Sequence, residues 1–240
     1  AARDGRADAL IPQTAGMGAE VVITGTGIPA PVHPERAGSG IVVRVDDTIL
    51  QVDAGTGTTL RLRQLGIPAP AITALLLTHH HSDHLVGLDD LVMERWLVGG
   101  DEVDPALPVV APAGPCVRFA ERLLDLWEDD IRVRQELSGT TTRPSLRVHA
   151  FDPPAAPAVV WSSGDVSGSA VTVHHEPVVP AVGYRIHTPY GDIAISGDTR
   201  LCDEVAELAA GADVLVHEAV CRSAAQRALG AYPERFDYIS

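Results

Sequence analysis

The pattern of apolar and polar positions predicts two kinds of strand. Residues 19–27 read as a strand that runs into a glycine turn. Residues 41–55 have alternating apolar positions, and the Asp46-Asp47 pair divides this stretch into two strands. The mostly apolar stretch 72–78 predicts a buried strand, and 107–112 predicts a short strand. Further strands are predicted at 169–179, 182–188, 191–199 and 213–220, the last of them buried.

Helical spacing of apolar residues predicts helices between these strands. The predicted ranges are 56–67, 87–99, 114–131 and 201–212. Residues 114–131 are expected to form one amphipathic helix. Strands clustered between helices indicate an α/β (α+β) chain whose sheets are covered by helices on their outer faces. Residues 1–18 have no period and are expected to be a flexible arm, and residues 19–240 one domain.

The composition limits the class of protein. A chain of 240 residues with 45% apolar residues can bury one sizeable core. Lys and Arg total 18 against 32 Asp and Glu, and the resulting charge of −14 disfavours a nucleic-acid partner. The three cysteines (Cys116, Cys202 and Cys221) are too few and too widely spaced for a disulfide framework, so core packing is expected.

The sequence gives little sign of targeting. No apolar run approaches the ~20 residues that a membrane span needs, so no membrane partner is expected. No signal-peptide pattern is present, although a cleaved signal would leave no trace. A cytoplasmic protein is the default expectation.

The stretch LLLTHHHSDHL, residues 75–85, carries most of the candidate chemistry. Imidazole and carboxylate groups are metal ligands, and polar residues at the carboxyl end of a buried strand commonly build a site. Because side chains alternate along extended backbone, His79 and His81 point the same way. After a turn, Asp83 and His84 can share a second space. The motif therefore predicts the beginnings of two adjacent metal sites.

Other residues near these motifs have more than one interpretation. His80 and Ser82 are expected to face away from the ligand pairs. His174 and His175 offer a further imidazole ligand. Asp198 follows a predicted strand in a glycine turn, where a lone Asp is more often a turn residue than a ligand.

The segments THHHSDH, HHEPVVPAVGYRI, SGDTR and DVLVHEA, in this order, resemble the metallo-β-lactamase superfamily. Within it they are most similar to the ribonuclease Z and arylsulfatase-like branch. ITGTGIP, RAGSG and QVDAGTGTTLRL, which contains Asp53, look like the opening strands and glycine turns of the family. The resemblance covers residues 20–220. It implies a four-layer αββα sandwich with two metal ions, usually Zn²⁺ with Mn²⁺ or Fe as alternatives, in a cleft at the sheet edges.

The resemblance also implies roles for individual residues. The implied ligands are His79, His81 and His175 for the first metal, Asp83 and His84 for the second, and Asp198 as the bridge. His175 is preferred to His174 because the family's ligand comes two residues before a proline, here Pro177. Asp83 can also orient or deprotonate water. His217 is a candidate proton donor to the leaving group, or else a strand-end histidine satisfied by a carboxylate such as Glu218.

The sequence departs from the family pattern in two places. Ribonuclease Z enzymes that process tRNA usually carry a long basic arm where this chain has only RIHTPYGDIAI between Tyr184 and Ser196. The family also has a further histidine ligand well after the Asp198 position, and the only histidine here after Asp198 is His217. The expectation is a missing C-terminal part and an incomplete second metal site.

Together these features predict a metal-dependent hydrolase that uses a metal-bound hydroxide to cleave a small ester, with a phosphodiester favoured. The alternatives are a carboxylic ester, lactone or arylsulfate hydrolase, a ribonuclease Z-type RNA 3′-end endonuclease, and a non-catalytic metal-binding protein. The expected partner is a small-molecule ester, and a homodimer is left open.

Overall fold

The computed structural model describes residues 18–29 and 34–220, which form two β-sheets. The first sheet has the order β1-β2-β3-β4-β5-β6, and the second has the order β11-β10-β9-β8-β7. The first sheet consists of β1 (Ala19–Gly25), β2 (Gly40–Val45), β3 (Thr48–Val52), β4 (Ala74–Leu76), β5 (Ala106–Pro112) and β6 (Ser145–Phe151). The second consists of β7 (Ala158–Ser163), β8 (Val166–Thr172), β9 (Val182–Thr188), β10 (Gly191–Ile195) and β11 (Val214–Val216). Apart from Gly18, the predicted arm at 1–18 lies outside the described residues.

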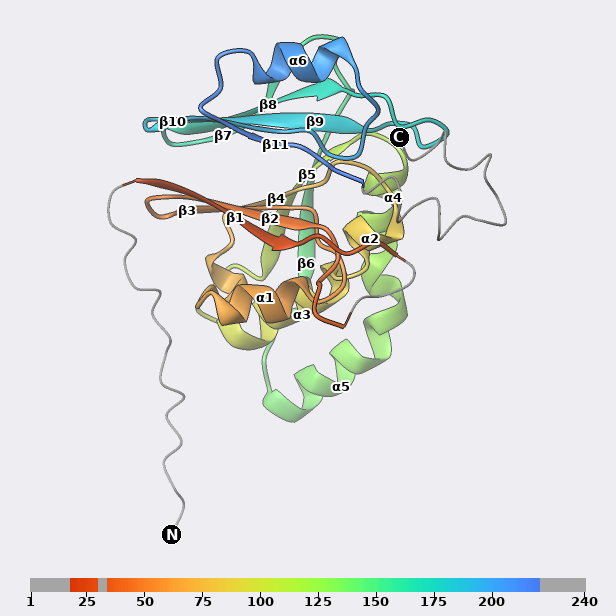
Figure 1. The fold of residues 1–240 in the computed structure, drawn as a ribbon. Helices are drawn as coiled ribbons and strands as arrows, with labels where there is room; N and C mark the ends of the chain where they lie inside the picture. Colours follow the sequence, from red (N-terminus) through yellow and green to blue (C-terminus); the bar gives the residue numbers. More distant parts are fainter. Residues whose placement is uncertain (1–17, 30–33, 221–240) are drawn as a thin grey trace.

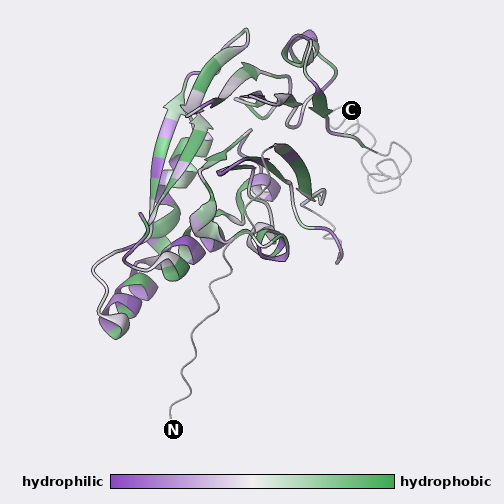
Figure 2. Ribbon diagram, turned by 90° about the vertical axis from the view of Figure 1, so that its left-hand side faces the viewer, coloured by the Kyte–Doolittle hydropathy of each residue, from purple (hydrophilic) through white to green (hydrophobic). Residues whose placement is uncertain are grey.

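The two sheets lie face to face between layers of helices. Figure 1 shows α1 (Thr58–Gln64) and α3 (Leu88–Gly99) below the first sheet and α6 (Asp203–Ala209) above the second. The four-layer αββα prediction is therefore confirmed. Figure 2 shows that much of the hydrophobic colour falls on the strands. Burial of apolar surface on both faces of each sheet is the main force that stabilises such a sandwich.

Each pair of layers encloses its own apolar cluster. Leu62, Leu75 and Leu91 are fully buried between the first sheet and its helices. Leu76 and Tyr184 are fully buried between the two sheets, where the Tyr184 hydroxyl donates to the Leu77 carbonyl oxygen at 2.7 Å. That bond satisfies the only polar atom of the buried side chain and ties the second sheet to the segment that leads into the histidine motif.

The predicted single helix at 114–131 is wrong. This segment forms α4 (Pro115–Arg122), the 3₁₀ turn η2 (Leu123–Trp127) and α5 (Glu128–Ser138). None of the η2 residues is fully buried: Leu123 and Leu124 pack only partly against the core, and Leu126 is 92% exposed. Packing is therefore weak in the middle of the segment, where the predicted helix is interrupted. The acidic residues at 128–130 lie in the first turn of α5, where negative charge stabilises the start of a new helix.

The strand predicted at 213–220 is present as β11 (Val214–Val216), but the prediction that it is buried is wrong. β11 pairs in parallel with β10 at the end of the second sheet, and Val214 and Leu215 are 42% and 49% exposed. An apolar run predicts a strand but not its place in the sheet. Of the cysteines, Cys116 is fully buried as predicted, Cys202 is partly buried, and Cys221 lies outside the described residues.

The sheet topology brings the motifs to one edge. β3, β4 and β5 are parallel neighbours, so the segments that follow β3 and β4 emerge side by side. The segment after β4 contains the histidine motif and the one-turn helix α2 (Ser82–Leu85). The Val182 N–H donates to the Thr78 carbonyl oxygen at 3.1 Å and so joins the second sheet to this edge. No helix in the described ranges is long and apolar enough to cross a membrane.

Candidate metal centre

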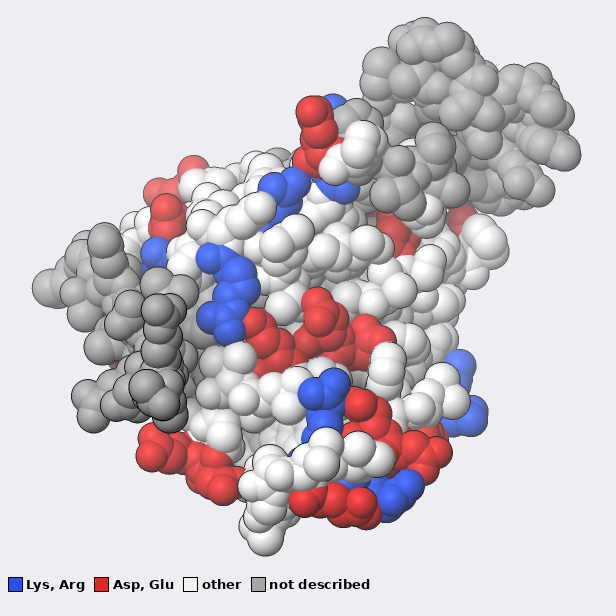
Figure 3. All heavy atoms as spheres, turned by 90° about the horizontal axis from the view of Figure 1, so that it is seen from below, with Lys and Arg blue, Asp and Glu red and all other residues white. Residues whose placement is uncertain are grey.

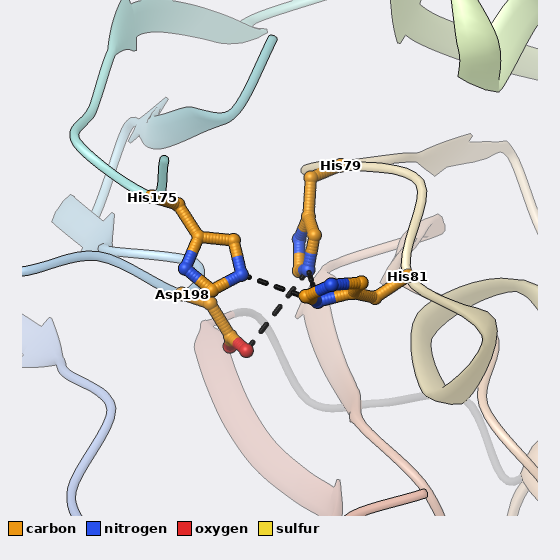
Figure 4. Close-up of side chains that lie close together, drawn as sticks. All are labelled: His79, His81, His175 and Asp198. Carbon is orange, nitrogen blue, oxygen red and sulfur yellow. Dashed lines mark hydrogen bonds and ion pairs between the residues drawn. The ribbon is translucent and has the colours of Figure 1, made fainter. Parts of the chain in front are cut away.

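Four side chains point toward one another at the edge of the sheets (Figure 4). His79 and His81 follow β4, His175 follows β8, and Asp198 follows β10. One ligand atom of each lies within 4.8 Å of the others. The His81 Nδ1 atom is 3.1 Å from His79 Nε2 and 3.2 Å from His175 Nε2. Three ring nitrogens and one carboxylate oxygen therefore share one small space.

Burial keeps two imidazoles of this group, those of His79 and His175, in their neutral form. Burial lowers the pKa of His79 to about 2, and the nearby positive charge of His84 acts in the same direction. Burial also lowers the pKa of His175, although Asp198 opposes it. Both rings are therefore neutral at neutral pH, which is the protonation state that binds a metal ion.

Asp198 also faces a second group of side chains. Its Oδ2 atom lies 4.0 Å from His79 Nε2 and 3.4 Å from His84 Nε2. The Asp83 Oδ2 atom lies 3.8 Å from the same nitrogen of His84. Asp198 is thus located between the two sets of ligand candidates, where a bridging carboxylate would lie.

Charge–charge interactions dominate the second group. Burial alone would lower the pKa of His84, but Asp53 and Asp198 outweigh burial and raise this pKa to about 11. Burial would raise the pKa of Asp198, but its interaction with His84 lowers this pKa to about 2. In the metal-free protein His84 therefore carries a positive charge. The carboxylates around it favour positive charge at this position.

Two residues behind the ligand candidates were not predicted as site residues. Asp53 follows β3 and Thr78 follows β4. The Asp53 carboxylate accepts hydrogen bonds from His84 Nδ1 at 2.7 Å and from the Thr78 N–H and hydroxyl at 2.8 Å each. Polar residues that directly follow two parallel strands meet only when those strands are neighbours. The strand order would therefore have identified Asp53 and Thr78 as site residues, but the local sequence pattern does not give that order.

Two histidines next to the ligand candidates lie outside the group. The His80 ring centroid is 6.3 Å from that of His81, and within the described residues its buried Nδ1 atom has no hydrogen-bond partner. His174 Nε2 lies 3.2 Å from a carboxylate oxygen of Glu204 on α6. His175, rather than His174, is the histidine of this pair that faces the cluster.

His217 also lies outside the group. Its side chain is exposed, and its Nδ1 donates to the carbonyl oxygen of the next residue, Glu218, at 2.8 Å. The Glu218 carboxylate accepts a hydrogen bond from the Thr199 N–H, and burial raises its pKa to about 7. Within the described part of the chain no interaction joins His217 to the clustered ligands, so its role as a proton donor stays a prediction.

Comparison with known proteins identifies the family. Residues 48–232 match the family model of the β-lactamase superfamily domain. Over 203 residues the chain is 37% identical to a ribonuclease Z of Mycobacterium bovis, and the match spans 84% of this chain and 70% of that protein. The chain belongs to the metallo-β-lactamase superfamily. It is a hydrolase of the metallo-β-lactamase type.

Solved structures of metallo-β-lactamase proteins share the fold. The short form of human tRNase Z superposes with a TM-score of 0.63 at 24% identity, covering 88% of this chain and 82% of that one. The metallo-β-lactamase fold protein YhfI from Bacillus subtilis superposes with a TM-score of 0.62 at 20% identity, covering 82% and 70%. At this level of identity the likeness concerns the fold alone.

The clustered donors fit the metal binding that a metallo-β-lactamase fold suggests. Three imidazole nitrogens with one carboxylate suit a four-coordinate first-row metal such as Zn²⁺. Hydrogen bonds to Thr78 and Asp53 occupy the far nitrogens of His79 and His84, which leaves their Nε2 atoms directed at the cluster. Outer hydrogen bonds of this kind commonly orient metal-binding histidines.

Proposed function

We propose that this chain is a metal-dependent phosphodiester hydrolase. In this proposal His79, His81 and His175 hold one divalent cation, Asp83 and His84 hold another, and Asp198 bridges them. The supporting observation is the position of Asp198 Oδ2 between His79 Nε2 and His84 Nε2. Zn²⁺ suits the histidine-rich donors, and Mn²⁺ or Fe are alternatives.

The chemistry that two such cations supply when bound is Lewis acidity toward a phosphoryl oxygen and toward water. Asp83 is proposed to have a second role, as a proton acceptor. Its side chain is 12% exposed and its Oδ2 lies 3.8 Å from His84 Nε2, so the carboxylate borders the cluster and can accept a proton from attacking water. His217 is proposed to return a proton to the leaving group, which requires its exposed ring to turn toward the substrate.

RNA is the second candidate substrate. The relatives named ribonuclease Z favour it, because they are 34% to 37% identical over most of this chain. These relatives also count against the expectation, drawn from the net charge, that nucleic acid is an unlikely partner. Two observations favour a small phosphodiester instead. β9 and β10 are joined by a tight turn with no room for a basic arm. Figure 3 shows several acidic patches, with separate groups of Lys and Arg between them, and so no continuous basic surface on that face.

The proposal can be tested by comparing substrates on one preparation. The protein is stripped of metal with a chelator and reloaded with Zn²⁺ or Mn²⁺. It is then assayed with bis(p-nitrophenyl) phosphate, p-nitrophenyl acetate, p-nitrophenyl sulfate and a precursor tRNA with a 3′ trailer. Asp198→Asn removes a proposed ligand, and Asp165→Asn, in an exposed turn between β7 and β8, is the matched control.

We expect metal-dependent turnover of bis(p-nitrophenyl) phosphate that Asp198→Asn abolishes and Asp165→Asn retains. Faster turnover of the acetate or sulfate would overturn the phosphodiester proposal in favour of the other ester classes. Cleavage of the precursor tRNA at a defined 3′ site, weakening steeply between about 50 and 200 mM salt, would establish the RNA alternative.

A further inference from the structure

Thr78 lies between two buried groups of the candidate metal centre. Its hydroxyl oxygen is 2.8 Å from Asp53 Oδ2 and 3.0 Å from His79 Nδ1. Thr78, Asp53 and His79 are all buried. The partners of the buried Thr78 hydroxyl are therefore two protein groups, one carboxylate and one imidazole.

The chemistry of the groups sets the direction of these bonds. A carboxylate only accepts hydrogen bonds, so the single Thr78 hydroxyl proton must go to Asp53 Oδ2. The hydroxyl oxygen then accepts from His79, which places the proton of that neutral ring on Nδ1. The other nitrogen of His79, Nε2, keeps its lone pair and faces His81 Nδ1 at 3.1 Å.

The same oxygen of Asp53 serves the second group of ligands. His84 Nδ1 lies 2.7 Å from Asp53 Oδ2, the atom that also accepts from the Thr78 hydroxyl. The Thr78 N–H fixes the carboxylate through Oδ1 at 2.8 Å. One carboxylate thus contacts an imidazole from each candidate site, His84 directly and His79 through Thr78.

We infer that Thr78 is a positioning residue, whose hydroxyl relays the Asp53 carboxylate to His79 and so selects the ring nitrogen that faces the first metal. The role of Thr78 in metal binding rests on the proposed function, but the first test below needs no metal. Ser keeps a hydroxyl at this place, whereas Val is close in shape to Thr and has none. Thr78→Ser and Thr78→Val therefore separate the relay from simple packing.

The first test uses metal-free protein. Long-range ¹⁵N–¹H correlation spectra of the histidine rings report which nitrogen carries the proton, and His79→Ala assigns the His79 signals. We expect His79 with its proton on Nδ1 in the wild type and in Thr78→Ser. In Thr78→Val the acceptor is lost, so a second His79 tautomer should appear while the His84 signals stay unchanged.

The second test measures the first metal ion bound, by competition with a chromogenic chelator. Loss of an outer hydrogen bond to a metal-binding histidine typically weakens binding about 10- to 100-fold, and we expect this loss in Thr78→Val. Thr78→Ser should stay close to the wild type. Thr59→Val is the matched control, because Thr59 is also a buried threonine and its hydroxyl has no partner among the described residues.

The outcomes distinguish this inference from the proposed function. A wild-type His79 protonated on Nε2 would overturn the inference, as would a Thr78→Val variant with unchanged tautomer and metal affinity. Equal losses of metal affinity in Thr78→Ser and Thr78→Val would mean that Thr78 acts through packing, which would also overturn the inference. If the wild type binds no metal but its spectra agree with the relay, the proposed function fails and the relay stands.

Discussion

The Nδ1 atom of His84 lies 2.7 Å from Oδ2 of Asp53, and both side chains are buried. This contact fixes the ring so that Nε2 faces Asp83 and Asp198. Asp53→Asn keeps the size of the side chain but removes its charge and one acceptor. We expect it to lower metal affinity about 10- to 100-fold, as measured by chelator competition, because it loosens His84 and the Thr78 relay together.

The control for this variant is Asp165→Asn, which changes the net charge of the chain equally at an exposed turn. It should leave metal affinity unchanged. If both variants weaken binding alike, the effect comes from overall charge and not from the hydrogen bonds of Asp53.

Neighbouring histidines of the motif should respond differently to truncation. His81 Nδ1 lies within 3.2 Å of two other ring nitrogens, so His81→Ala should lower both metal affinity and turnover by roughly 100-fold or more, beyond the usual effect of an outer-sphere partner. His80 contributes no atom to the cluster, and its buried Nδ1 has no partner among the described residues. His80→Ala should therefore keep most activity.

The two variants form a matched pair, because each removes one imidazole from the same segment. Metal content and turnover of bis(p-nitrophenyl) phosphate should be measured on both. Equal losses would contradict the division of the motif into ligands and a bystander.

Gly55 allows the segment with Asp83 to approach the loop after β3. A Cβ atom on Gly55 would overlap the Asp83 carbonyl oxygen and lie 2.6 Å from backbone atoms of Gly38 and Ser39. Because these neighbours are backbone, they cannot rotate away. Gly55→Ala should destabilise the fold by about 1–3 kcal/mol in urea unfolding and displace Asp83 from the cluster.

Gly168 on β8 provides the comparison. A Cβ there would meet side-chain atoms of Ile186 and Leu76 at ordinary distances of 3.6 and 3.8 Å. Gly168→Ala should therefore change stability by less than about 1 kcal/mol. If Gly55→Ala is equally mild, the close approach to Asp83 is not a constraint on the fold.

The local part of this architecture could be predicted from the sequence. The Asp46-Asp47 pair divides β2 from β3 as the alternation predicts, and 182–188 forms β9 with the predicted ends. The crowding of histidines after a buried strand predicts a cluster of ligand candidates at a strand end. These features depend on residues close together in the chain, so periodicity and turn chemistry suffice to find them.

Long-range contacts could not be predicted in this way. Asp53 and Thr78 are 25 residues apart, and their hydrogen bonds follow from the parallel pairing of β3 and β4. The exposed position of β11 follows likewise from the strand order, and the break before α5 follows from packing that is missing around Leu126. Strand order and packing are properties of the whole fold, and a local sequence pattern does not contain this information.

Asp192 connects two strands and a helix at some distance from the metal cluster. Its Oδ2 accepts from Arg185 at 2.8 Å and from His187 Nδ1 at 2.9 Å. Arg185 also donates to the carbonyl oxygens of Leu208, in α6, and of Ala210, just after it. Burial would raise the pKa of Asp192, but the hydrogen bonds from Arg185 and His187 outweigh it and lower this pKa.

This shift gives a pH dependence of known sign. A carboxyl group whose pKa is lower in the folded state contributes stability above its unfolded pKa of about 3.9, and the contribution disappears as the pH falls through the folded value. Asp192→Asn should therefore cost about 1.5–3 kcal/mol at pH 7, the usual range for hydrogen bonds to a charged group. The cost should shrink below about pH 4.

Urea unfolding of metal-free protein at pH 7 and pH 3 measures this change without interference from metal loss. Asp165→Asn, at an exposed turn, serves again as the control and should unfold like the wild type at both values. A cost for Asp192→Asn that is the same at pH 7 and pH 3 would mean that the side chain acts through packing, because only the ionised carboxylate makes the charged interactions with Arg185 and His187.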